Sequence, residues 1–77
     1  MSNSEISNSM YSCIKKFTSI TPGIYFLKKP SRIMVIWEKN IPDKNAILDI
    51  EEALKQFGTV LPNHKLKSNF VCFEITH

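Results

Sequence analysis

The sequence contains few of the residues on which several classes of protein depend. It has two cysteines, two histidines and two glycines among 77 residues. Two cysteines are too few for a disulfide-rich secreted scaffold, and Gly23 and Gly58 stand too far apart to form a glycine-rich phosphate loop. The cysteines and histidines also lack zinc-site spacing; they are Cys13, Cys72, His64 and His77. We therefore expect two thiols in a reducing compartment, no bound metal and no small-molecule cofactor.

Long apolar runs are also absent, and this bears on the location of the protein. The longest run, Ile33–Trp37, is far shorter than the roughly 18–20 residues that a membrane span needs. The first residues show neither the basic stretch nor the apolar core of a signal peptide. We expect a cytoplasmic protein with no membrane partner.

The length and the composition favour a single domain over residues 1–77. Hydrophobic residues make up 43% of the chain and charged residues 22%, which is typical of a globular protein and not of a disordered one. A domain of this size has a thin core, and this excludes a large enzyme with a deep pocket.

Hydrophobic spacing predicts two helices and four strands. Apolar residues that recur at intervals of three and four indicate helices, and short runs rich in aromatic and β-branched residues indicate strands. The expected helices cover residues 3–18 and 44–57, and the expected strands cover 23–29, 32–38, 59–67 and 70–75. The third of these strands is expected at a sheet edge, because Pro62 cannot donate a backbone hydrogen bond.

The expected order is therefore α-β-β-α-β-β, in an α+β fold. Two helices on one face of a four-stranded antiparallel sheet would bury both apolar stripes. The same order results when the last helix and strand of the ferredoxin-like order β-α-β-β-α-β are moved to the front. We expect a circularly permuted ferredoxin-like sheet, because the termini of domains often lie close together.

The strand over 32–38 is apolar on both of its faces. Odd-numbered residues form one face and even-numbered residues the other: Ile33, Val35 and Trp37 against Met34, Ile36 and Glu38. If both helices cover one side of the sheet, the other side exposes an apolar patch, which usually marks an interface. The candidate interface residues are Tyr25, Leu27, Met34 and Ile36. They favour a small regulatory or inhibitory binding module whose partner is another protein or a second copy of itself, as a homodimer.

Part of the chain, residues 32–75, resembles an RNA recognition motif. Three segments carry the resemblance. Ile36–Pro42 is similar to the first-strand signature of that family, Ile50–Gly58 to its first helix, and Phe70–Phe73 to the end of its third-strand signature. The resemblance implies a ferredoxin-like sheet that binds RNA, with Trp37 and Phe70 stacking on unpaired bases.

The basic residues give a second argument for nucleic acid. Ten Lys and Arg against seven Asp and Glu give a formal net charge of +3. Five basic residues are candidates for phosphate contacts: Lys28, Lys29, Arg32, Lys65 and Lys67. Tyr25 is a third candidate for base stacking, which contributes about 1–3 kcal/mol per base. RNA or single-stranded DNA is therefore the alternative partner.

Catalysis is the least supported function. His64 stands beside Lys65 and could act as a general base near a bound phosphate. The sequence shows no second catalytic group at an informative spacing from it. We therefore expect no catalytic residues.

Overall fold

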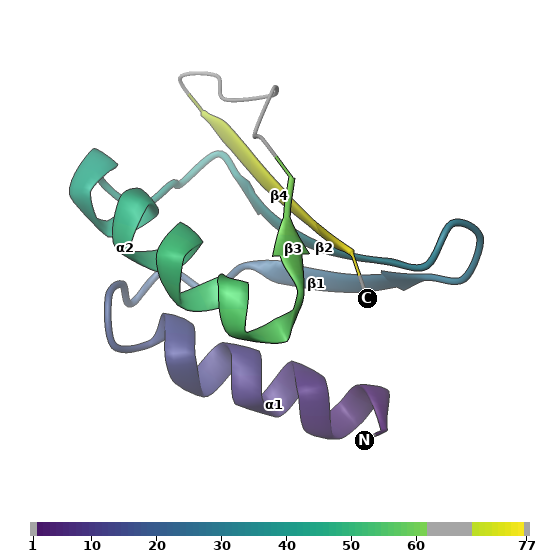
Figure 1. The fold of residues 1–77 in the computed structure, drawn as a ribbon. Coiled ribbons are helices and arrows are strands. Elements are labelled where there is room, and N and C mark those ends of the chain that lie inside the picture. Colours follow the sequence, from purple (N-terminus) through teal and green to yellow (C-terminus); the bar gives the residue numbers. More distant parts are fainter. Residues whose placement is uncertain (1, 62–68, 77) are drawn as a thin grey trace.

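The structure, a computed structural model, describes residues 2–61 and 69–76 (Figure 1). The described elements are, in chain order, α1 (Asn3–Ile14), β1 (Gly23–Leu27), β2 (Arg32–Glu38), α2 (Lys44–Leu54), the 3-10 helix η1 (Lys55–Phe57), β3 (Thr59–Val60) and β4 (Phe70–Thr76). The strands form one sheet in the order β1-β2-β4-β3, and each pair of neighbours is antiparallel. The expected α+β fold, with a four-stranded antiparallel sheet and two helices, is confirmed.

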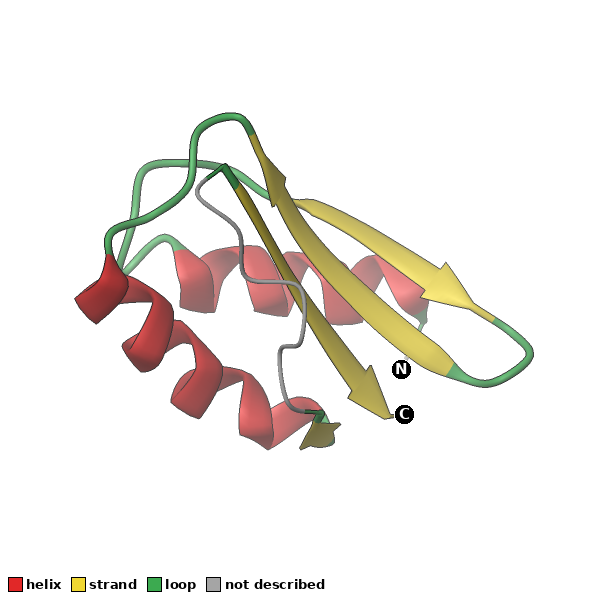
Figure 2. Ribbon diagram, turned by 90° about the horizontal axis from the view of Figure 1, so that it is seen from above, coloured by secondary structure: helices red, strands yellow, loops and turns green. Residues whose placement is uncertain are grey.

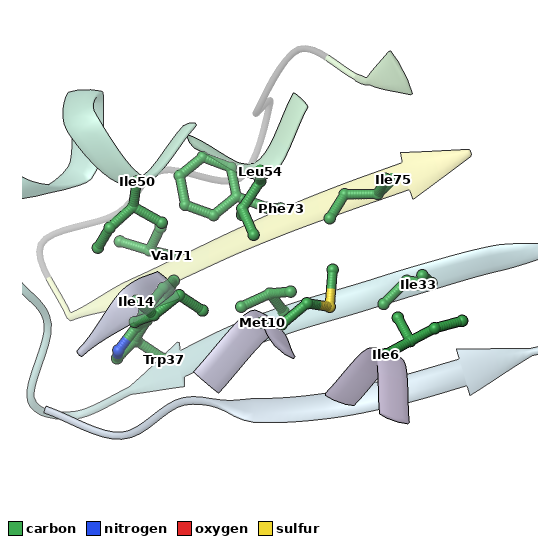
Figure 3. Close-up of a cluster of buried hydrophobic side chains, with 11 residues drawn as sticks. Ile6, Met10, Ile14, Ile33, Trp37, Ile50, Leu54, Val71, Phe73 and Ile75 are labelled. Carbon is green, nitrogen blue, oxygen red and sulfur yellow. The ribbon is translucent and has the colours of Figure 1, made fainter. Parts of the chain in front are cut away.

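Both α-helices lie on the same side of the sheet (Figure 2). Each helix turns a buried apolar stripe toward the strands; these residues are Ile6, Met10 and Ile14 of α1 and Ile50 and Leu54 of α2. They pack against alternate residues of the two central strands, Ile33, Val35 and Trp37 of β2 and Val71, Phe73 and Ile75 of β4 (Figure 3). We call this side of the sheet the inner face. Each fully buried side chain of this kind contributes about 1.5–3 kcal/mol to folding.

The first helix begins as the sequence predicts but ends earlier. The Ser2 hydroxyl accepts a hydrogen bond from the Glu5 amide at 3.2 Å, and the Glu5 carboxylate accepts one from the Ser2 amide at 3.4 Å. The predicted end at residue 18 is wrong, because α1 ends at Ile14. Beyond it, the Phe17 amide donates to the Ile14 carbonyl at 2.9 Å, a bond across three residues that tightens the turn and redirects the chain. Phe17 therefore leaves the predicted stripe and lies at the surface.

The second helix follows its sequence signals closely. The Asp43 carboxylate accepts a hydrogen bond from the Ala46 amide at 2.8 Å and caps α2. After Leu54 the helix tightens into η1, and Gly58 ends it with a φ of 154°. A Cβ at Gly58 would clash with the backbone carbonyl oxygen of Thr76 in β4. Glycine is therefore needed where the chain leaves the helix and passes β4.

The strands agree with the sequence best at the centre of the sheet. β2 has the predicted bounds, and β4 is one residue longer than predicted. β1 ends at Leu27, two residues before the predicted end, because residues 28–31 form the hairpin turn. The structure shows Thr59–Val60 of the strand predicted over 59–67, and residues 62–68 lie outside the described residues.

Candidate interaction surface

The side of the sheet turned away from the helices is the candidate site, and we call it the outer face. Strand residues paired across the sheet share a face, so the register defines this surface. It consists of Gly23, Tyr25 and Leu27 of β1, Arg32, Met34, Ile36 and Glu38 of β2, Thr59 of β3, and Phe70, Cys72, Glu74 and Thr76 of β4. Among the described elements, both α-helices lie on the other side (Figures 1 and 2).

The four predicted interface residues lie together on the outer face. Tyr25 is paired with Met34, and Ile36 is paired with Gly23, so all four occupy the two strands β1 and β2 side by side. Tyr25 is 56% exposed and Leu27 is 45% exposed, while Met34 and Ile36 are half-buried. They form one continuous apolar patch, of the kind that a partner can cover.

The side chain of Tyr25 lies back over Gly23. A Cβ built on Gly23 would stand 2.8 Å from the Tyr25 hydroxyl oxygen and 2.9 Å from its Cε2. The missing side chain of the glycine therefore provides the space for the end of the tyrosine ring. More than half of Tyr25 remains exposed, so the ring forms a broad solvent-facing part of the patch.

The outer face carries charges of both signs. Arg32 lies at one end of β2 and Glu38 at the other, and Glu74 of β4 is paired with Met34 between them. In the described part of the chain, the one ion pair joins Lys55 and Glu52 at 2.9 Å on the helical side. The hydrogen bond to Glu52 raises the pKa of Lys55, and the carboxylate charge acts in the same direction. The three charges of the outer face thus have no ionic partner among the described residues.

Three of the predicted phosphate-binding residues lie together at the β1–β2 hairpin. Lys28 and Lys29 are exposed, and Arg32 is half-buried with its Nη1 donating to the Ser31 carbonyl oxygen at 2.9 Å. The other candidates, Lys65 and Lys67, lie outside the described residues, as do His64 and His77. The hairpin alone therefore supplies the basic cluster that the structure shows.

Trp37 lies on the inner face, and its burial rules out the stacking role that the resemblance implies. It is 1% exposed, its Nε1 donates to the Ile20 carbonyl oxygen at 2.9 Å, and its ring meets Phe73 edge-on with centroids 6.0 Å apart. Phe70 lies on the outer face, because it is paired with Glu38. The two residues are thus on opposite sides of the sheet and cannot stack on neighbouring bases together.

Gly23, Glu38 and Glu74 are outer-face residues that the sequence did not single out as site residues. The signal for Glu38 is the alternation in β2, where the odd-numbered positions are wholly apolar and the even-numbered ones run from Arg32 to Glu38. A strand phase with a charge at each end is favoured on the solvent side. Gly23 carried no signal beyond its place two residues before Tyr25.

The helical side offers weaker candidates. A shallow depression of about 600 Å³ lies between α1 and η1, and Gln56 Nε2 donates to Cys13 Sγ at 3.4 Å beside it. Cys13 and Cys72 take part in no disulfide. Within residues 2–61 and 69–76, no group of three His, Cys, Asp or Glu side chains is arranged to hold a metal ion. No helix in these ranges has the length and hydropathy needed to cross a membrane.

Compared with family models, curated proteins and solved structures, the chain gives no significant match. The function must therefore be inferred from the geometry of the outer face.

Proposed function

We propose that the chain is a small, non-enzymatic binding module that acts through protein–protein contacts made by the outer face, as an inhibitor or a regulator. The observation that carries the proposal is the exposure of Tyr25 and Leu27 beside Met34 and Ile36. Covering such a patch is favourable, because each square ångström of apolar surface removed from water contributes about 25 cal/mol. Two cysteines without a disulfide support a cytoplasmic location.

The proposal includes a circularly permuted ferredoxin-like topology. Its support is the strand order β1-β2-β4-β3. In this order β4 lies between β2 and β3, and α2 is part of the connection that leads from β2 to β3. A ferredoxin-like sheet has the same arrangement once its last helix and strand are moved to the front of the chain. Such sheets carry both helices on one face and leave the other face available for binding.

The experiment compares two leucines that are exposed on different surfaces. Leu27 is 45% exposed on the outer face, and Leu48 is 56% exposed on α2. The tagged wild-type chain, Leu27→Glu and Leu48→Glu are incubated with nuclease-treated extract of the cells that make the protein. We expect a protein retained by the wild type and by Leu48→Glu, and its loss with Leu27→Glu. Equal retention by the two variants would contradict the proposal.

A specific observation also favours nucleic acid as the second candidate partner. Lys28, Lys29 and Arg32 lie together at the hairpin whose first strand carries the exposed Tyr25, and none of them has a carboxylate partner among the described residues. Cations grouped on the same hairpin as an exposed aromatic ring suit a single-stranded backbone with a stacked base. The outer face itself carries two carboxylates and one guanidinium, and this charge favours the protein partner over RNA.

Binding of a mixed-sequence single-stranded RNA distinguishes the two candidates. If RNA is the partner, retention falls steeply with salt, and Lys28→Glu with Lys29→Glu abolishes it. The matched control is Lys15→Glu with Lys16→Glu, which makes the same charge change beyond the end of α1. Equal losses in both pairs of variants would show a response to net charge alone.

A further inference from the structure

We propose that a second copy of this chain covers the outer face, packed sheet to sheet about a two-fold axis that crosses β2 at the level of Val35. This inference rests on the proposed function and names its partner. In such an interface the same surface serves both subunits, so it must be complementary to itself. The outer face meets this condition along β2.

The outer row of β2 reads Arg32, Met34, Ile36, Glu38. This order is basic, apolar, apolar, acidic. When a second copy of the row runs in the opposite direction, each basic residue faces an acidic one and the apolar residues face each other. Arg32 and Glu38 each stand three residues from Val35. They are about 20 Å apart at roughly 3.3 Å per residue, so they cannot pair within one chain.

A two-fold axis perpendicular to the strands, in the plane between the sheets, reverses β2 of the partner. Arg32 then faces the partner's Glu38, and Met34 faces the partner's Ile36. Sheets packed face to face lie about 10 Å apart, which long side chains span. Glu74 lies diagonally from Arg32 across β2 and β4, and the described residues form no ion pair between the two. The axis thus joins opposite charges at both ends and apolar side chains at the centre.

The same axis places Tyr25 of each subunit near the centre of the interface. Tyr25 is level with Met34 and Gly23 is level with Ile36, so the axis lies midway between Tyr25 and Gly23 on β1. Because the tyrosine ring lies back over Gly23, it lies close to this midpoint. The axis therefore brings the exposed rings of the two subunits toward each other. An aromatic pair of this kind contributes about 0.5–1.5 kcal/mol beyond the area that it buries.

The size of the face bears on the strength of the dimer. The molecule measures 31 × 24 × 19 Å, and the outer face occupies only part of its broadest side. A standard interface needs about 800 Å² from each partner. Because the outer face is only part of a side that measures 31 × 24 Å, we expect it to bury less than this area, in a weak dimer with a dissociation constant on the order of micromolar.

Charge reversal with rescue tests this arrangement by sedimentation equilibrium over about 0.5–500 µM, a range that covers a micromolar dimer and variants at least tenfold weaker. We expect Arg32→Glu and Glu38→Arg each to weaken the dimer about tenfold or more, because each places like charges opposite one another. The double variant Arg32→Glu/Glu38→Arg should recover the wild-type dimer, because both contacts are restored with inverted sign. Since the two residues cannot meet within one chain, recovery reports a contact between chains.

Matched controls carry the same charge changes on the helical side. Lys16→Glu corresponds to Arg32→Glu, and Asp49→Arg corresponds to Glu38→Arg; both residues are exposed. Circular dichroism establishes that every variant is folded. A monomeric wild type, or a double variant as weak as the single ones, overturns the inference. If the wild type is monomeric while Leu27→Glu alone loses a captured protein, the second copy is excluded and the proposed function stands.

Discussion

Replacing Trp37 with phenylalanine tests the orientation of the central strand. The substitution keeps a ring against Phe73 but removes the Nε1–H that donates to the Ile20 carbonyl at 2.9 Å. An acceptor left without its donor costs about 1–3 kcal/mol, and the smaller ring adds about 1 kcal/mol for the cavity. We expect a loss of about 2–4 kcal/mol. This is a large fraction of the total stability of a 77-residue domain, which is about 4–12 kcal/mol.

Urea unfolding followed by far-ultraviolet circular dichroism measures the loss without relying on the single tryptophan as a probe. Tyr25→Phe is the matched control, because it changes an aromatic side chain that is 56% exposed on the outer face. We expect the control to stay within about 0.5 kcal/mol of the wild type. If Trp37→Phe is equally silent, Trp37 is not buried against the helices and the assignment of the two faces is wrong.

Five further substitutions test the elements around the core by the same unfolding measurement. Gly58→Ala should destabilise the domain by more than about 1 kcal/mol, because its Cβ meets fixed backbone at a φ that side chains rarely adopt. Gly23→Ala should cost less, since its Cβ meets only a movable tyrosine ring, and a larger cost for Gly23 would refute this difference. Asp43→Ala should cost about 1 kcal/mol through the lost cap of α2, and a neutral result would show that the cap is dispensable. Ile50→Asp should unfold the domain by placing an unpaired charge in the core, whereas Glu52→Lys should change stability little, because its ion pair is exposed.

The sequence predicts the elements well where a single local signal decides them. Asp43 and Gly58 mark the limits of the second helical segment, and β4 alternates between apolar inner residues and an outer phase that includes Glu74. The end of α1 was not predictable in this way. The stripe continues to Phe17, while the hydrogen bond from Trp37 to Ile20 holds the following loop against the sheet. That bond joins residues 17 positions apart, so no local pattern contains it.

For the candidate site too, the sequence predicts the features that local patterns decide. Tyr25, Leu27, Met34 and Ile36 could be placed together from alternation and a hairpin, both of which are local. The family resemblance implies a base-stacking role for Trp37, although its strand phase is wholly apolar and therefore suited to the interior. Periodicity within β2 was the better guide, because burial depends on the whole face of the strand and not on one motif position.

The strand order has a consequence for the synthesis of the protein. The central pair of the sheet joins β2 to β4, so residues 32–38 can pair with β4 only after residues 70–76 have been made. Until then the emerging chain can form α1, α2 and the β1–β2 hairpin, but the inner apolar row of β2 lacks the core side chains of β4. Contacts this distant in sequence form late and slow the folding of small domains. The hairpin of the unfinished chain therefore exposes apolar surface on the ribosome, and we expect chaperones to bind the nascent protein mainly at that stage.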